Sequence, residues 1–215
     1  LKYVAAIEKY EESLRYPFNS TFKTLALYWI GEAYYAMNNY EAALTKLEAF
    51  RASNGAYTMT EFKNSLYTSG YAHYKLFNFQ AAADELRRFT REAAPDNPRL
   101  ADAYLRLADS YLLTGGYLVA AGFYQDALNK NTSQPDYALF QRAECLKLAG
   151  KPQEQIALLE MLIKRYPTST FSQDAQYEIP STQLQIESYS AALTGFNEYI
   201  NKYPQSPNVP SAALK

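Results

Sequence analysis

Cysteine, histidine and tryptophan are nearly missing from this sequence, which has one of each among 215 residues. With Cys145 as the single cysteine, no internal disulfide can form, which fits a reducing compartment but does not exclude an oxidising one. No cluster of Cys and His has the spacing of metal ligands, and no glycine-rich loop suited to phosphate occurs. We therefore predict no catalytic residues, no metal site and no cofactor. His73 is expected to be a packed or hydrogen-bonded interior group, and Cys145 a buried, inert thiol.

Strong charge of one sign and long apolar runs are absent as well. The sequence has 21 basic and 22 acidic residues, a formal net charge of -1, which gives no general attraction to nucleic acid or to an anionic membrane. No run of about 18 apolar residues occurs, so no segment is expected to span a bilayer. Tyrosine, in contrast, occurs 21 times, and its ring with a polar tip suits both helix packing and binding surfaces.

One pattern recurs along the chain: an aromatic residue, then Ala three positions later, then a large apolar residue four positions after that. Successive frames begin 35–39 residues apart. The frames are Tyr3–Ala6–Tyr10, Tyr40–Ala43–Leu47, Phe79–Ala82–Leu86, Tyr117–Ala120–Tyr124 and Tyr189–Ala192–Phe196, with Pro152–Gln155–Leu159 as a degraded copy. Internal repetition at such a period is typical of stacked supersecondary units.

A second pattern precedes these frames and predicts a second helix in each repeat. A small residue lies nine positions before the frame, as Gly31, Gly70, Ala108 and Ala143. Short turns separate the two patterns: Asn38-Asn39, Phe77-Asn78, Gly115-Gly116 and Gly150-Lys151. Asn and Gly end helices because they tolerate left-handed backbone. We predict two amphipathic helices per repeat, A and B, which cross where small side chains let the axes approach to about 8–10 Å.

These frames resemble the tetratricopeptide repeat over nearly the whole chain. The resemblance implies an all-α fold, a right-handed α-α superhelix of stacked helix-turn-helix repeats. All of it would form one solenoid domain, with these parts: a half repeat (helix B) at 1–18, full repeats at 21–52, 60–94, 98–131, 135–167 and 171–204, and the start of a truncated repeat at 207–215. A chain that opens and closes inside this pattern is expected to be an excerpt of a longer protein.

The fifth repeat departs from the pattern, because Pro180 occupies the position that Gly31 has in the first. A proline inside a helix removes one hydrogen bond and clashes with the preceding turn, at a cost of roughly 3 kcal/mol. We therefore predict that helix A of this repeat is kinked or broken at Pro180.

The ends of some repeats carry a narrower resemblance. Arg165-Tyr166-Pro167-Thr168-Ser169 and Lys202-Tyr203-Pro204-Gln205-Ser206 close the last two repeats, and Arg15-Tyr16-Pro17 closes the leading half. This ending resembles periplasmic TolA-binding proteins and outer-membrane assembly lipoproteins of Gram-negative bacteria, although the first three full repeats lack it. The resemblance implies a location in the periplasm or at the periplasmic face of the outer membrane, with the cytoplasm as the alternative.

In such repeats the helices A line a concave groove, which is the expected binding face for a partner protein or peptide. Ring stacking, tyrosine hydroxyls and interspersed acids would favour a basic or neutral ligand. The residues predicted to bind the partner are Tyr28, Glu32, Tyr35, Tyr67, Tyr71, Tyr74, Asp109, Phe140, Glu144, Lys147 and Tyr177. Any of these tyrosines could instead only pack between helices. The acidic tails bound by some chaperone-clamping repeats are disfavoured, because Glu32 and Asp102 would repel them.

The function predicted from these features is a protein-interaction scaffold in a bacterial envelope assembly, not an enzyme. The alternative is an accessory glycan-binding lipoprotein of the starch-utilisation type, since tyrosines stack on sugar rings. That alternative is disfavoured because those proteins carry long non-repeat insertions, and this sequence has none. Neither the partner nor the oligomeric state follows from the sequence.

Overall fold

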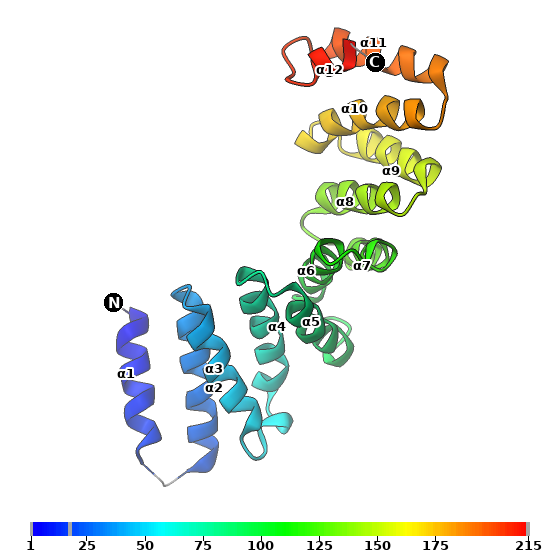
Figure 1. Ribbon diagram of the computed structural model, residues 1–215. Coiled ribbons are helices and arrows are strands. Elements are labelled where there is room, and N and C mark those ends of the chain that lie inside the picture. Colours follow the sequence, from blue (N-terminus) through cyan, green and yellow to red (C-terminus); the bar gives the residue numbers. More distant parts are fainter. Residues whose placement is uncertain (1, 17–18, 214–215) are drawn as a thin grey trace. The chain divides into compact units, whose positions relative to one another are not determined.

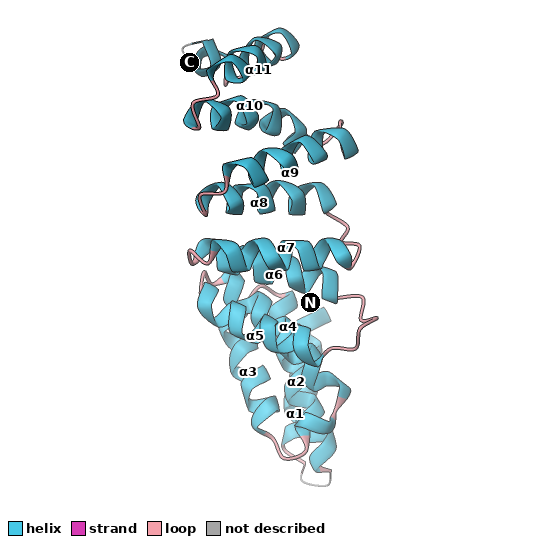
Figure 2. Cartoon of the chain, turned by 90° about the vertical axis from the view of Figure 1, so that its right-hand side faces the viewer, coloured by secondary structure: helices cyan, strands magenta, loops and turns pink. Residues whose placement is uncertain are grey.

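The computed structural model describes residues 2–16 and 19–213, and these ranges fold as helices joined by short loops, without any strand (Figure 2). The predicted all-α fold of helical repeats is therefore confirmed. Pro17, the last residue of the first Arg-Tyr-Pro ending, lies outside the described residues. The chain divides into two compact units, 1–114 and 115–215, and each is described by itself.

Unit 1 contains six α-helices and one short 3-10 helix among its described residues (Figure 1). Helices that follow one another along the chain pack together as antiparallel pairs, and α4 also contacts both α2 and α6. The elements are α1 (Lys2–Leu14), α2 (Ser20–Ala36), α3 (Tyr40–Ala52), η1 (Ala56–Thr58), α4 (Thr60–Lys75), α5 (Phe79–Glu92) and α6 (Leu100–Leu113). Helices α2, α4 and α6 are the predicted helices A, and α3 and α5 are helices B.

Unit 2 repeats the arrangement with six further helices among its described residues. They are α7 (Tyr117–Asn129), α8 (Pro135–Leu148), α9 (Pro152–Arg165), α10 (Thr170–Gln185), α11 (Tyr189–Lys202) and α12 (Val209–Ala213). Here α8 and α10 are helices A, and α7, α9 and α11 are helices B. The division of the chain at 114/115 places the two helices of the predicted repeat 98–131 in different units.

The glycines of the repeat pattern lie where helices A and B cross in unit 1. A methyl group on Gly31 would come within 2.7 Å of Leu47, and one on Gly70 within 2.5 Å of Leu86. Both distances are shorter than any real carbon contact, so the leucines occupy the space that the missing side chains leave. The predicted role of the small residue at the crossing is thus confirmed.

The turns between helices A and B use left-handed backbone, as the sequence predicts. Asn38, Phe77, Gly115, Gly150 and Glu187 have φ between 60° and 82°. In each predicted turn the left-handed residue is the first of the pair. Phe77 and Glu187 adopt this conformation without the composition that favours it, because the hydrogen bonds of the turn fix the backbone there.

Helix α10 continues through Pro180, so the predicted break is wrong, while a kink at that place stays a prediction. Pro180 is buried, and across from it lies Gly195 of α11, where a methyl group would come within 2.9 Å of the proline ring. The small residue of this crossing is on helix B, and it leaves room for the ring. Packing of the ring offsets the hydrogen bond that proline cannot make.

The Tyr-Pro-x-Ser endings are helix-to-helix connectors with one geometry. Tyr166 and Tyr203 end α9 and α11 with nearly equal dihedral angles, φ -132° and -128°, ψ 60° and 59°. Backbone N–H groups of Ser169 and Ser206 donate to the tyrosine carbonyls at 3.0 and 2.9 Å. The side chain of Ser169 then caps α10 by accepting from the N–H of Phe171.

Candidate partner-binding surfaces

The A surface of unit 1 is formed by side chains of α2, α4 and α6. We define it by the members that cluster across these helices: Glu32, Tyr35, Tyr67, Thr68, Tyr71, Tyr74 and Asp102. Helix α4 lies between the other two, so that hydrogen bonds from it reach α2 on one side and α6 on the other.

Asp102 is held by two tyrosines from the neighbouring helix α4. The hydroxyl of Tyr67 donates to Asp102 Oδ2 at 2.6 Å, and the hydroxyl of Tyr71 donates to the same oxygen. The two rings lie 5.0 Å apart between centroids. Burial, together with the neighbouring Asp102, raises the pKa of both tyrosines, so both hydroxyls stay protonated as donors.

Glu32 is bound by a hydroxyl in the same way. Thr68 Oγ1 of α4 donates to Glu32 Oε1 at 2.6 Å. Burial raises the pKa of Glu32, although the bond from Thr68 and the charge of Arg99 act in the opposite direction. Within residues 2–16 and 19–213, no Lys or Arg forms an ion pair with either Glu32 or Asp102.

The two cations closest to this surface contact its tyrosines but do not pair with Glu32 or Asp102. The guanidinium of Arg99 stacks over the ring of Tyr67 at 5.0 Å and donates to Asn64 Oδ1 at 3.1 Å. Arg106 pairs with Asp109 on its own helix. The A surface of unit 1 therefore combines two carboxylates without a bound cation with several tyrosine rings.

Two residues predicted to bind a partner are packed instead. Tyr28 is 3% exposed, with its ring 5.4 Å from that of Phe50, and Asp109 is 2% exposed. Neither offers surface to a partner in this structure, because the helices pack over them. Tyr35 and Tyr74 are half-buried beside Tyr40 and Phe79, and burial raises the pKa of Tyr35 to about 12.

The A surface of unit 2 has a different composition, and we define it by Phe140, Glu144, Lys147, Tyr177 and Glu178. Phe140 stacks on Phe171 with centroids 5.1 Å apart and ring planes 27° from parallel. Tyr177 lies between the rings of Phe196 and Tyr199, at 5.9 and 5.5 Å. These rings connect α8 to α10 and α10 to α11.

Lys147 is the cation of this second surface. Its ammonium donates to Glu178 of α10 and lies 3.8 Å from Glu144 Oε2 on its own helix. Burial lowers the pKa of Lys147, but the two carboxylates outweigh it and the net effect raises it. Burial raises the pKa of Glu144, whose Oε1 is buried without a hydrogen bond from the described residues. Lys147 is thus the shared ion-pair partner of Glu144 and Glu178.

Sequence reasoning missed Thr68 and Glu178 as members of these surfaces. Both lie next to a predicted residue, Tyr67 and Tyr177, and both reach a residue about one repeat away, 36 and 31 positions along the chain. The repeat period limits which residues of neighbouring repeats can contact each other, but it does not distinguish such a residue from the one next to it in the sequence. Of the two residues predicted to be packed, Cys145 is fully buried, whereas His73 is only partly buried and burial lowers its pKa.

Neither a metal cluster nor a membrane span is found in the described part of the chain. No three His, Cys, Asp or Glu side chains there gather closely enough to hold a metal ion. None of the helices in these ranges combines the length and the apolar character that crossing a bilayer requires.

Comparisons with known proteins agree with this geometry. A family model described as "Tetratricopeptide repeat" matches residues 25–54 and 137–169. No curated protein matches the sequence. The fold is similar to "YrrB: a TPR protein with an unusual peptide-binding site", with TM-score 0.73, 16% identity, and coverage of 97% of this chain and 100% of that chain.

Two further solved structures share the arrangement. One is titled "Crystal structure of MamA protein", with TM-score 0.68, 16% identity, and coverage of 85% of this chain and 92% of that chain. The other is a Podosopora anserina putative kinesin light chain with nearly identical TPR-like repeats, with TM-score 0.61, 14% identity, and coverage of 86% and 97%. At such identities the likeness shows the fold alone, which is that of tetratricopeptide repeats.

Proposed function

We propose that this chain of tetratricopeptide repeats is a binding scaffold that holds an extended, basic segment of a partner protein on the A surface of unit 1. Stacked helical repeats present side chains of successive helices as one continuous binding surface. Function is decided by the site and not by the fold, so the residues of that surface determine what the chain can bind.

The observation that carries the proposal is the pair Glu32 and Asp102. Both carboxylates are held by neutral hydroxyls and neither forms an ion pair in the described ranges. A lysine or arginine from a ligand would supply the missing cation through a charge-assisted hydrogen bond, which is stronger than a neutral one. An acidic ligand would instead meet two carboxylates that no cation of the described residues pairs with.

The tyrosine rings beside these carboxylates would contact the rest of the ligand. Tyr67 and Tyr71 lie next to Asp102, and Tyr35 lies on the same helix as Glu32. Tyrosine is enriched at interfaces because it buries a large ring and keeps a hydroxyl for hydrogen bonding. The peptide-binding site of YrrB supports the proposal by analogy.

The test is the affinity of fluorescein-labelled ten-residue peptides for the whole chain, measured by fluorescence anisotropy. Three peptides share an alternating apolar pattern and differ only in carrying lysine, glutamine or glutamate at the other positions. We expect the lysine peptide to bind best and the glutamate peptide worst, because neither Glu32 nor Asp102 forms an ion pair with a cation of the described residues.

Variants of the A surface sharpen this test. We expect the pair Tyr67→Ala and Tyr71→Ala, and separately Asp102→Asn, to weaken lysine-peptide binding at least tenfold. Glu41→Gln, at an exposed position of α3, is the matched control and should leave the peptide affinity unchanged. Unchanged affinity in the A-surface variants would overturn the proposal, as would binding of a starch oligosaccharide without any peptide binding.

We further propose that the scaffold works in a bacterial cell envelope, as its Tyr-Pro-x-Ser endings suggest. The support is the resemblance of Arg165–Ser169 and Lys202–Ser206 to the periplasmic proteins named above. Fractionation of the native cells should recover the protein with periplasmic or outer-membrane markers. Recovery with cytoplasmic markers would contradict this location and leave the peptide-binding proposal intact.

A further inference from the structure

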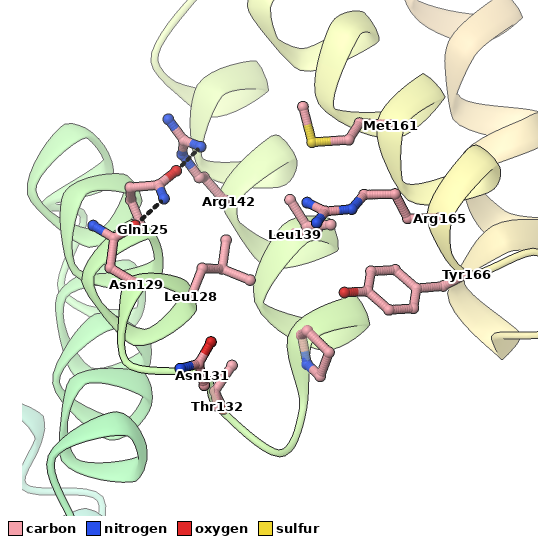
Figure 3. Close-up of a pocket in the computed structure, with 11 residues that line it drawn as sticks. Gln125, Leu128, Asn129, Asn131, Thr132, Leu139, Arg142, Met161, Arg165 and Tyr166 are labelled. Carbon is pink, nitrogen blue, oxygen red and sulfur yellow. Dashed lines mark hydrogen bonds between the residues drawn. The ribbon is translucent and has the colours of Figure 1, made fainter.

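A cavity of about 490 Å³ opens in unit 2 between α7, α8 and α9, away from the A surface. Figure 3 shows Arg142 extending from α8 toward α7, and Arg165, at the end of α9, and Tyr166, directly after it, extending toward α8. Sites of roughly 300–1,000 Å³ are the usual size for small-molecule ligands. The cavity is therefore large enough for a compact organic molecule.

The cavity is cationic, although the chain as a whole is not. Two arginines, Arg142 and Arg165, line it together with amide and hydroxyl side chains, and no carboxylate is among the lining residues. The whole sequence has 21 basic and 22 acidic residues, so a lining with two cations and no acid is not a reflection of composition. Such a lining would attract a negatively charged group.

Arg142 leaves hydrogen-bonding capacity unused at this cavity. One terminal nitrogen donates to Gln125 Oε1, and Gln125 in turn donates to Asn129 Oδ1 at 2.8 Å (Figure 3). The Nε–H of Arg142 is buried and has no acceptor in the described part of the chain. An unsatisfied buried donor costs about 1–3 kcal/mol, and more when the group is charged.

The surrounding charges do not neutralise Arg142. Glu154 of α9 acts on it electrostatically, but the carboxylate of Glu154 already accepts from Lys151 Nζ at 2.8 Å. Burial lowers the pKa of Arg142, since the guanidinium is partly withdrawn from water. An anion in the cavity would offset that loss of hydration.

Apolar side chains form the rest of the lining. Leu128 of α7 and Met161 of α9 face the same space, and Met161 is 41% exposed despite its apolar side chain, whereas Leu139 of α8 lines the cavity from a buried position. A hydrated inorganic ion would leave this apolar surface uncovered. A ligand with an apolar body would cover it, at about 25 cal/mol for each Å² removed from water.

We propose that this cavity binds a small organic carboxylate, with its carboxylate between Arg142 and Arg165 and its apolar body against Leu128 and Met161. Arginine suits this role because its planar guanidinium presents paired donors that match a carboxylate. The same chemistry could come from a free short-chain acid or from the terminal carboxylate of a peptide, and the test below separates these sources.

This site is independent of the A surface, because the two use different faces of α8. Successive helical residues are rotated by about 100°, which places Leu139 and Arg142 on one face and Phe140, Glu144 and Lys147 on nearly the opposite one. A ligand in the cavity would therefore leave the A surface of unit 2 accessible, and the A surface of unit 1 lies on other helices.

The test is isothermal titration calorimetry of the whole chain with matched probes. 4-Methylpentanoate represents a free acid, N-acetyl-leucine a peptide terminus, N-acetyl-leucinamide the neutral counterpart, and inorganic phosphate a bare anion. We expect saturable binding of at least one carboxylate, and at least tenfold weaker binding of the amide and of phosphate. The carboxylate that binds more tightly identifies the source.

Arg142→Met and Arg165→Met should each weaken carboxylate binding at least tenfold, because methionine keeps the apolar stem and removes the charge. Arg91→Met, at an exposed position of α5, is the control and should bind like the wild type. If Arg142→Met fails to fold, as judged by its circular dichroism, Arg165→Met decides alone because that side chain is exposed. Absence of saturable carboxylate binding, equal binding of phosphate or the amide, or unchanged affinity in the foldable variants would overturn the proposal.

Discussion

In unit 1, Glu32 and Asp102 are held by the hydroxyls of Thr68, Tyr67 and Tyr71, whereas in unit 2, Glu144 and Glu178 share the ammonium of Lys147. Both pairs of acids lie on helices A. The same repeat therefore leaves the acids of one surface without an ion pair and joins those of the other to a lysine. A repeat fixes where side chains lie, but it leaves their chemistry free to differ between units.

The helix crossings of the two units differ in a similar way. In unit 1 the small residue is on helix A, where Gly70 faces Leu86 of helix B. At the α10–α11 crossing of unit 2 the bulky residue is Pro180 on helix A, and Gly195 of helix B supplies the space. Close approach of two helices needs one small residue at the contact, and either helix can provide it.

The largest expected effect is at the unit 1 crossing. Gly70→Ala should lower the free energy of unfolding by about 1–3 kcal/mol, because the new methyl group would meet Leu86 at 2.5 Å. Urea unfolding measures this change. Gly122→Ala in α7 is the matched control: a methyl group there meets nothing within 4 Å, so stability should rise by about 0.5–1 kcal/mol. Equal effects of the two substitutions would contradict the assigned crossing.

A smaller effect is expected at the cation of unit 2. Lys147→Met should lower the free energy of unfolding by about 1–2 kcal/mol, since it leaves Glu144 and Glu178 beside each other without a cation. Thermal unfolding at neutral pH measures it. Lys151→Met removes an exposed pair with Glu154 and should change stability by less than about 0.5 kcal/mol. Equal changes in the free energy of unfolding would mean that the pairing of Lys147 stabilises the fold no more than the exposed pair of Lys151 does.

The smallest effect is expected at Glu32, and it depends on pH. Burial raises the pKa of Glu32 above its ordinary value, so as pH rises the unfolded chain loses this proton before the folded chain does. The contribution of Glu32 to the free energy of unfolding is fully present below the pKa that this group has in the unfolded chain. It is lost as pH rises through the higher pKa that Glu32 has in the folded chain. Glu32→Gln should therefore raise the unfolding midpoint at pH 7 and change it little near pH 4.

A thermal melt series from pH 4 to pH 8 checks this prediction, with the exposed Glu41→Gln as control. The gain at pH 7 should be on the order of 1 kcal/mol or less, with no comparable gain for the control. A lower midpoint for Glu32→Gln at pH 7 would mean that the hydrogen bond from Thr68 outweighs the cost of burial. The same variant should bind the lysine peptide more weakly, so stability and binding would change in opposite directions.

Much of the fold could be predicted because each repeat is specified locally. The spacing of Gly31 and Gly70 from their frames predicted where helices A and B cross. The turn residues predicted where the backbone is left-handed. Pro180 misled the prediction of a break, because the compensating Gly195 lies on another helix. The turn at Gly115-Gly116 has the composition of the other turns, so no local signal marks the division into two units there.

The candidate surfaces could be predicted only in outline. Helices A of neighbouring repeats meet at residues 31–36 positions apart, so the period limits which residues can contact each other. Within that limit Tyr28 and Asp109 are buried, whereas Glu178 is only partly buried and binds Lys147, and Thr68 binds Glu32 from a buried position. A rotation of one residue around a helix, about 100°, decides between burial and exposure, and repeat spacing does not resolve it.

By itself, the sequence determined a chain of paired helices, since periodic small residues and turn residues act within one repeat and need no distant partner. Only the tertiary structure decided which hydroxyl meets which carboxylate, that Gly195 makes room for Pro180, and that two arginines line one cavity. These features join side chains from separate helices, and their contacts depend on packing that no single repeat contains.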